Sequence, residues 1–390
     1  MSEWKEYRFS DLLIDESISY GIVQPGSHKE YDSIPIIRVN NIKDGSIQTN
    51  NILKVDKEIE RKYQRTKLHG GELLITVVGS VGECAIVSKS FAGWNVARAV
   101  SVARFKNDFD IHFVKYSFKT DDILFQMYGN TNDTVQPTLN LSELKSIKFN
   151  IPSLPEQRAI ATILSCLDDK IDLLHRQNKT LEAMAEALFR QWFVEFNFPN
   201  FDGELVDGIP KGWIVLDLGS VSTLIAGGDK PKNFSTQQNE LFKIPIYSNG
   251  ITNEGLYGFT DLPRVSEESV TVSARGTIGY VCLRVKPFVP IVRLIAVIPN
   301  QKFISAKYIY FWLKNEKISG TGTTQQQLTV PDFKISKVLV PNIELINKFT
   351  LVVNSLFQKI EENIYQIRTL TQLRDTLLPK LMSGEVRVIS

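Results

Sequence analysis

Two short turns in this 390-residue chain combine glycine with side chains that suit contacts with nucleic acid. They are Gly79-Ser-Val-Gly82 and Gly276-Thr-Ile-Gly279, and each follows an apolar segment typical of a strand. Glycine there permits a positive φ or a close approach of the backbone to a partner, and an arginine beside it suits a phosphate or a guanine. A plain hairpin turn is an equally good interpretation. The polar side chains of these turns are Ser80, Arg275 and Thr277.

A second pair of matched segments is dense in threonine and glutamine: GNTNDTVQPTLN (129–140) and GTGTTQQQLTV (320–330). Glutamine and asparagine match the edge of adenine, and threonine serves bases or phosphates. The same chemistry at the equivalent place in both halves favours DNA contact over a plain flexible loop. The candidate residues are Thr134, Gln136 and Thr138 in the first half and Thr323, Thr324, Gln325 and Gln326 in the second.

A third candidate group lies in IIRVNNIKDG (36–45), which has a counterpart in YSNGITNEG (247–255). In both segments, amide side chains follow the end of an apolar strand pattern. One further arginine interrupts the apolar stretch WNVARAV (94–100). The predicted DNA-binding residues of this group are Arg38, Asn40, Asn41, Arg98 and Asn249.

Motifs for catalysis or cofactor binding are missing from the sequence. There is no G-x-x-x-x-G-K-[ST], no G-x-G-x-x-G after a strand, and no aromatic tetrapeptide of the kind that amino-methyltransferases use. The four histidines have no spacing that would bind zinc. We therefore expect a chain that catalyses nothing itself and holds no metal or cofactor.

The composition narrows the class of protein without naming a partner. The formal net charge is only +2, so any DNA contact must come from local patches. No apolar run is long enough to span a bilayer, and the first residues lack a signal-peptide core. Three widely spaced cysteines are expected to be reduced thiols. These features predict a cytoplasmic protein with no membrane partner.

The elements that must position these residues occur twice in the chain. Trp213 follows Trp4 by 209 residues (213 − 4), and Gly276 follows Gly79 by 197 (276 − 79). The closing stretch, 152–188 against 341–377, matches without a gap at an offset of 189 (341 − 152). The offset falls because the globular parts differ in loop length while the closing helices keep equal length. A period near half the chain predicts two-fold pseudosymmetry.

Both closing stretches carry the apolar pattern of a coiled coil. The first helix is expected to begin at a capping box formed by Ser153 and Glu156, and Pro379 is expected to bend or end the second helix. A helix over 160–193 would be roughly 50 Å long, against about 34 Å between DNA half-sites one turn apart. The stripes are Leu164, Leu167, Ile171, Leu174, Asn178, Leu181, Ala185 and Leu188 in the first helix, and Val353, Leu356, Ile360, Asn363, Ile367, Leu370, Arg374 and Leu377 in the second.

The two asparagines decide how the helices pair. A parallel pairing would set Asn178 and Asn363 each against a hydrocarbon, whereas in an antiparallel register they face each other and Leu164 meets Leu377. A buried amide without a partner costs about 1–3 kcal/mol, so we predict an intramolecular antiparallel coiled coil with an Asn–Asn layer that sets its register. The alternative is that both asparagines lie at the wet edge of the seam.

The expected fold is α+β: two α/β heads separated by two long helices with pseudo-two-fold symmetry. The predicted divisions are a head over 1–152, a helix over 153–200, a second head over 201–341 and a second helix over 342–390. Short amphipathic helices are expected at 113–128 and 306–315. The aromatic residues Phe189, Trp192, Phe193 and Phe196 at the end of the first helix are candidates for docking a partner subunit, and packing against the following head is the favoured alternative.

Three segments at the ends of the predicted helices resemble those of a known family. IPSLPEQRAIATIL (151–164), ALFRQWFVEF (187–196) and LLPKLMSGEV (377–386) look like the helical ends of specificity (S) subunits of Type I restriction–modification systems. The resemblance implies two target-recognition domains that each read part of a split double-stranded DNA site, with the helices setting the unread gap.

The same resemblance implies partners. Two methyltransferase (M) subunits would dock around the helices and restriction (R) subunits would join for cleavage, with S-adenosylmethionine, ATP and Mg²⁺ bound by those subunits. The family has no catalytic residues to transfer, and its base-reading residues differ between members. Two alternatives remain: a methylase–specificity fusion that has lost its catalytic part, and a coiled-coil scaffold joining two ligand-binding domains unrelated to DNA, which the near-neutral charge favours.

Overall fold

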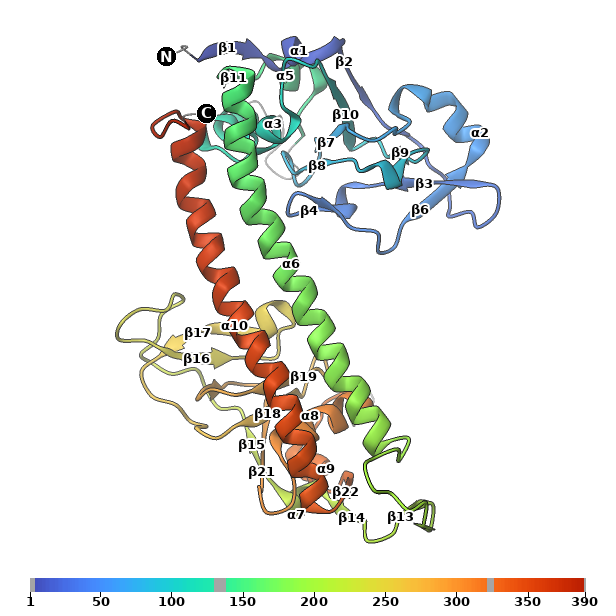
Figure 1. The fold of residues 1–390 in the computed structure, drawn as a ribbon, viewed down its shortest axis with the longest axis vertical. Coiled ribbons are helices and arrows are strands. Elements are labelled where there is room, and N and C mark those ends of the chain that lie inside the picture. Colours follow the sequence, from blue (N-terminus) through green and yellow to red (C-terminus); the bar gives the residue numbers. More distant parts are fainter. Residues whose placement is uncertain (1–3, 130–137, 321–325, 389–390) are drawn as a thin grey trace. The chain divides into compact units, whose positions relative to one another are not determined.

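The computed structural model describes residues 4–129, 138–320 and 326–388. The chain forms two compact units, one made of residues 1–174 with 365–390 and the other of residues 175–364. Each unit contains one α/β head and one part of each long helix (Figure 1).

The head of the first unit is built on a four-stranded antiparallel sheet whose central strand, β7, is buried along its whole length. A smaller sheet pairs β3 with β6 in antiparallel and with β9 in parallel orientation, and β1 pairs with β11 where the chain enters and leaves the head. The strands in sheet order are β2 (Leu13–Tyr20), β10 (Val100–Phe105), β7 (Leu73–Thr76) and β8 (Cys84–Ile86); β6 (Leu53–Asp56), β3 (Ser33–Ile37) and β9 (Asn95–Val96); β1 (Lys5–Arg8) and β11 (Lys148–Ile151).

The head of the second unit repeats these three sheets. The remaining strand pairs differ between the heads: β4 (Ile42–Lys43) pairs with β5 (Ser46–Ile47) in the first, and β12 (Leu205–Val206) pairs with β13 (Ile209–Pro210) at the start of the second. Its four-stranded sheet has the same antiparallel order, its small sheet again contains one parallel pair, β16 with β20, and β14 pairs with β22. The predicted repeat is therefore confirmed. The strands in the same order are β15 (Ser222–Ala226), β21 (Leu294–Pro299), β18 (Ser269–Ser273) and β19 (Val281–Arg284); β17 (Leu256–Thr260), β16 (Ile244–Tyr247) and β20 (Val289–Pro290); β14 (Ile214–Asp217) and β22 (Lys337–Val340).

Short helices pack around these sheets, and polar side chains cap the first turns of two of them. Asp110 caps α3 by accepting from two backbone amides, and Ser305 caps α8. The predicted helix at 306–315 is confirmed, whereas the one at 113–128 is divided into α3 and α4 at residues 118–120. The helices are α1 (Phe9–Leu12), α2 (Lys57–Glu60), α3 (Ile111–Ser117), α4 (Asp121–Gly129) and α5 (Leu141–Ser146) in the first head, and α7 (Leu218–Val221), α8 (Ala306–Asn315) and α9 (Val330–Lys334) in the second.

The two long helices have equal length, since α6 (Leu154–Phe193) and α10 (Ile343–Met382) each contain 40 residues. α6 begins directly after Ser153, and the Glu156 carboxylate is buried and accepts hydrogen bonds from Arg387. The capping box itself stays a prediction. Pro379 does not end α10, which continues to Met382 before Gly384 adopts a φ of 74°.

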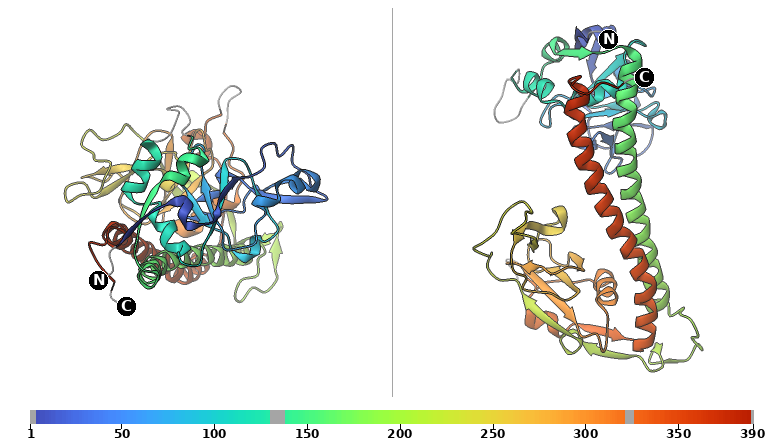
Figure 2. Two further views of the ribbon diagram at one scale, coloured as in Figure 1. Left: turned by 90° about the horizontal axis from the view of Figure 1, so that it is seen from above. Right: turned by 60° about the vertical axis from the view of Figure 1, so that its left-hand side comes forward.

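The long helices pack against each other in opposite directions within each unit (Figures 1 and 2). In the first unit, Leu164 near the start of α6 shares a core with Leu381 near the end of α10. In the second unit, Phe189 near the end of α6 shares a core with Phe349 near the start of α10. The predicted antiparallel coiled coil is therefore confirmed.

Candidate nucleic-acid interface

In the second head, three backbone hydrogen bonds gather distant segments at the end of the central strand β18. Ala274, just after β18, donates to the carbonyl of Arg293 (2.8 Å) and accepts from Leu328 (2.8 Å). Gly227 donates to the carbonyl of Leu294 (2.7 Å). The Gly276–Gly279 turn, the link from β20 to β21 and the glutamine-rich segment thus meet at one place.

The first head has the same three bonds at equivalent positions. Val77 donates to the carbonyl of Ala99 (3.0 Å) and accepts from Leu139 (2.9 Å), and Gly21 donates to Val100 (3.3 Å). Two of the three matched polar segments found in the sequence, the Gly-x-x-Gly turn and the segment before the long helix, are therefore brought together in both heads.

Glycine is required where the chain passes this meeting point. A Cβ added to Gly227 would lie 2.0 Å from the carbonyl oxygen of Ile291, and one added to Gly21 would lie 2.0 Å from that of Val96. These distances are far below van der Waals contact, so only glycine allows the segments to approach this closely.

A cationic hollow of about 550 Å³ opens at this point in the second head. Arg275, Arg293 and Gln327 line it, together with Ala226 and Gly227. Arg275 is half-buried and Arg293 is exposed. None of the described residues that line it is acidic. Two guanidinium groups without a nearby carboxylate suit a phosphate or a guanine edge.

Arg293 is a residue that the sequence reasoning did not find, although a signal was present. It interrupts the apolar stretch VPIVRLIAV as Arg98 interrupts WNVARAV. The positions of the two arginines differ by one residue between the heads. Arg293 supplies the carbonyl that accepts from Ala274, whereas in the first head the residue after Arg98, Ala99, supplies the carbonyl that accepts from Val77. Arg98 is exposed.

The matched turns are hairpins. In the second head, the segment 247–255 holds the turn by hydrogen bonds. The Asn249 side chain donates to the carbonyl of Arg275 (2.8 Å), and the Thr277 hydroxyl donates to the carbonyl of Asn249 (2.7 Å). Asn249 and Thr277 thus hold the backbone on which Arg275 is presented. In the first head, Ser80 is exposed and Thr138 forms an isolated bridge with Val78.

The structure gives Asn41 a structural role in place of the predicted DNA contact. It is 1% exposed, its amide nitrogen donates to the carbonyls of Gln48 and Asn50, and its oxygen accepts from the backbone of Arg38. The Arg38 guanidinium donates to the carbonyl of Asn51 (2.7 Å), which fixes the same loop. Asn40 is exposed, and its contact with DNA stays a prediction.

Gln326 is exposed next to Gln327. The remaining residues predicted from the threonine- and glutamine-rich segments lie outside the described residues: Thr134, Gln136, Thr323, Thr324 and Gln325.

The aromatic residues at the end of α6 are not a free docking surface. Phe189 and Phe193 are 0% and 1% exposed and pack against Tyr308 and Phe349 in the core of the second unit. Trp192 is also buried, and Phe196 packs edge-on against Trp213. The prediction of partner docking is wrong for Phe189, Trp192 and Phe193, which are buried, whereas Phe196 is half-buried. The favoured alternative, packing against the following head, is confirmed.

The predicted Asn–Asn layer is present in the second unit. The Asn363 side chain is fully buried and donates to Asn178 Oδ1 at 2.8 Å. Asn178 is half-buried, so the layer lies between the core of the seam and its edge. The register that sets these residues opposite each other is therefore confirmed.

Polar clusters that the sequence did not reveal join each head to the helices of its own unit. Asp168 on α6 accepts from the Tyr116 hydroxyl (2.7 Å) and from Arg374 of α10 (2.8 Å). Burial would raise the pKa of the Asp168 carboxyl, but the hydrogen bonds from Arg374 and Tyr116 outweigh burial and hold that pKa below its ordinary value.

In the second unit, Glu182 accepts from the Tyr310 hydroxyl (2.6 Å) and from Lys314 (3.0 Å). Burial again opposes these bonds, and they again lower the pKa of the carboxyl. Burial and the bond to Glu182 together raise the pKa of Tyr310. Each cluster therefore links a head to the long helices of its own unit by hydrogen bonds.

The described residues contain no cluster of histidine, cysteine, aspartate and glutamate that could hold a metal ion. A helix long and apolar enough to cross a membrane is also not found among them.

Comparisons with known proteins agree with the repeat. The profile of the Type I restriction modification DNA specificity domain matches residues 1–183 and again 210–365. The chain is 32% identical over 300 residues to the Type I restriction enzyme MjaIX specificity subunit of Methanocaldococcus jannaschii, covering 71% of this chain and 69% of that protein. It is 23% identical over 467 residues to the Type I restriction enzyme HindI specificity subunit of Haemophilus influenzae, covering 99% and 100%.

A solved structure has the same fold. The S subunit of a Type I restriction–modification system from M. genitalium aligns with a TM-score of 0.61 at 18% identity, over 97% of this chain and 96% of that one. The alternatives, a scaffold unrelated to DNA and a remnant of a catalytic fusion, find no support in these matches. The chain therefore belongs to the family of Type I restriction–modification DNA specificity subunits, which recognise DNA for such a system and are not its catalytic part.

Proposed function

We propose that this subunit directs its complex to a bipartite, asymmetric DNA site, with each head reading one half-site and the two helices setting the unread gap. The observation that carries the proposal is the recurrence of one backbone meeting point in two heads that present different side chains there. Equal scaffolds favour equal placement on DNA, and unequal side chains favour unequal half-sites.

The side chains at the two meeting points support asymmetry. The second head offers Arg275 and Arg293 in a hollow, whereas the first offers Ser80 and the exposed Arg98. Arginine pairs best with guanine, and a hydroxyl serves any base. The two heads should therefore prefer different sequences.

The helices suit the role of a spacer. Each has 40 residues, which corresponds to about 60 Å of α-helix. The buried Asn178–Asn363 bond fixes how far one helix is shifted along the other. A coiled coil with one register gives a gap of one length.

The chemistry of the system would be carried out by partners. We place two methyltransferase subunits on this chain, which would methylate adenine N6, and restriction subunits that would join them for cleavage. S-adenosylmethionine, ATP and Mg²⁺ would be bound by those subunits. The assembly would act in the cytoplasm, where it meets the DNA.

The test is to sequence the methylome of cells that express this chain with its cognate methyltransferase. The expected result is a split motif with one modified adenine in each part and a gap of constant length. A continuous motif would contradict the proposal, and so would methylation without sequence preference.

Exchange of one head separates the roles further. When residues 201–341 are replaced by the second head of another family member, one half of the motif should change, and the other half and the gap should stay. A change in both halves would show that the heads do not read independently.

A further inference from the structure

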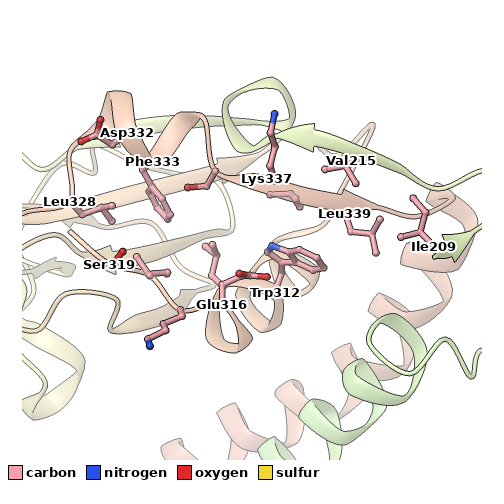
Figure 3. A pocket seen from close by; sticks show the side chains of 15 residues that line it. Ile209, Val215, Trp312, Glu316, Ser319, Leu328, Asp332, Phe333, Lys337 and Leu339 are labelled. Atoms are coloured by element: carbon pink, nitrogen blue, oxygen red, sulfur yellow. The ribbon is translucent and has the colours of Figure 1, made fainter. Parts of the chain in front are cut away.

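The second head contains an apolar groove of about 650 Å³, which shares Leu328 with the cationic hollow (Figure 3). It lies between the end of α8 and strand β22. Trp312, Leu328, Phe333 and Leu339 are among its apolar lining residues, and charged residues, including the exposed Lys317, also line it. Binding pockets are typically of this size and are lined mainly by apolar side chains.

The equivalent place in the first head is filled by helix α4. Ile123 and Met127, one helical turn apart, are 3% and 0% exposed and belong to the same core cluster as Leu139 and Leu144. Leu139 corresponds to Leu328 of the groove, because each donates its backbone amide at the meeting point of its head. Leu144 in α5 corresponds to Phe333 in α9, because each follows that residue by five positions.

A side chain of α4 also completes the sheet edge beneath it. Gln126 donates to the carbonyl of Lys148 (3.1 Å) and accepts from its amide (2.9 Å). Lys148 is the first residue of β11, and its counterpart in β22 is Lys337, which lines the groove. Among the described residues, no side chain bonds to the backbone of Lys337 in this way.

The corresponding segment of the second head is shorter. From the cap of α3 to the meeting point the first head has 29 residues (139 − 110), whereas the second has 23 from the cap of α8 (328 − 305). No helix is found between α8 and α9 in the described part of this segment. Ile318 lies against Gly279 in the second head, in the place that Met127 takes against Gly82 in the first. Ile318 therefore fills only that end of the groove.

One polar group in the groove lacks a partner. The indole Nε1 of Trp312 is buried and has no hydrogen-bond partner among the described residues. A buried donor without an acceptor costs stability.

We propose that this groove docks an amphipathic helix of the methyltransferase subunit in the place that α4 takes in the first head. The helix would carry two apolar residues four positions apart, like Ile123 and Met127, with an amide residue beside the second one to pair with the backbone of Lys337. The inference rests on the proposed function, since it takes the methyltransferase as the partner.

The first test uses photocrosslinking in the purified complex of the full chain with its methyltransferase. The photoreactive residue p-benzoylphenylalanine replaces Lys317 at the groove or, as the matched control, Asp122, the second residue of α4, and the products are mapped by mass spectrometry. The groove position should capture one helical segment of the methyltransferase with apolar residues four apart, and the control should not. Crosslinks from position 317 only to this chain, only to DNA, or to nothing would overturn the proposal.

The second test fills the groove. Ser319 is exposed and lines it, so Ser319→Trp should weaken methyltransferase binding by about tenfold or more, as expected for a central anchor site, while Ser319→Ala should not. Thermal unfolding checks that the variant folds, and Ser319→Arg replaces it if it does not. Unchanged affinity in a folded variant would overturn the proposal. The methylated motif should stay the same at saturating methyltransferase, so failure here is distinguishable from failure of the proposed function.

Discussion

At the scale of single residues, the second head concentrates its charge at one point. Arg275 is held by a hairpin that Asn249 and Thr277 brace, and Arg293 enters the same hollow from the link between β20 and β21. A chain with a net charge of only +2 can bind a polyanion in this way, because local charge decides contact with phosphates.

Replacing these two arginines should therefore change the salt dependence of DNA binding. Arg275→Gln and Arg293→Gln should each lower the slope of log K against log salt by about 1, if each removes one phosphate contact. The measurement is fluorescence anisotropy of the methyltransferase complex on cognate duplex. Lys302→Gln is the control. Lys302 is exposed and follows the other end of β21, so its replacement should leave the slope unchanged. Equal slopes for all variants would remove the hollow from the interface.

The asparagine layer also belongs to the residue scale. Asn363→Leu should destabilise the protein by about 1–3 kcal/mol, because it leaves the Asn178 amide beside hydrocarbon. The double variant Asn178→Leu/Asn363→Leu should recover most of that loss and pack less uniquely. Urea unfolding of the two single variants and the double variant measures the coupling. Additive losses would mean that the two amides do not interact.

At the scale of elements, each head is a repeated scaffold whose close approaches depend on glycine. The parallel bridge between Gly228 and Ile291 brings the chain so near that a side chain on Gly227 has no space. The same arrangement recurs at Gly21 beside the bridge of Ile22 and Ala97. Elements that differ in loop length thus keep an identical junction.

Gly227→Ala should for this reason damage the second head selectively. The added Cβ would push the segment away from Ile291, at a cost of about 1–3 kcal/mol. Recognition of one half-site should weaken in a methylation assay, while the other half-site is unaffected. Gly129→Ala is the control, because a Cβ there would meet nothing within 4 Å. Equal effects of the two substitutions would contradict this account.

The joint between the first head and the helices should depend on pH. The folded-state pKa of Asp168 lies below the ordinary value of 3.8, so its contribution to stability is present above that value and is lost as pH falls through the folded pKa. Asp168→Asn should therefore be less stable than the wild type at pH 7, and the difference should shrink below about pH 4. Urea unfolding followed by circular dichroism at several pH values measures this. A difference that is constant with pH would argue against the ionised carboxylate.

At the scale of the whole molecule, the two compact units divide the helices between them. Each unit contains one head, part of α6 and part of α10, so neither head folds onto its own helix alone. The long helices are therefore part of both cores as well as the link between them. This sharing explains why the helices keep equal length while the heads vary.

Lengthening both helices tests the spacer role. Inserting seven residues into α6 and seven into α10 at facing positions adds about 10 Å of helix and keeps the apolar stripe in phase. The gap in the methylated motif should grow by about three base pairs, at about 3.4 Å per pair, with both half-sites unchanged. Methylome sequencing gives the result. An unchanged gap would show that the helices do not set it.

Much of the fold could be predicted from the sequence because its signals are local and periodic. The apolar stripe fixes the seam of each long helix. Two asparagines whose positions in the stripes face each other only in an antiparallel pairing decide the register, without any information about the heads. The repeated turns and the repeated polar segments likewise follow from one-dimensional matching.

The roles of single polar and aromatic residues were decided only by the tertiary structure. Asn41 and Phe193 look equally available in the sequence, yet one is used by the carbonyls of its own loop and the other is buried against Tyr308. Arg293 joins Arg275, and Tyr116 joins Asp168, across long stretches of chain. Hydrogen bonding and burial depend on which distant segments meet. Periodicity carries no information about those meetings, because it records only the spacing of neighbours along one element.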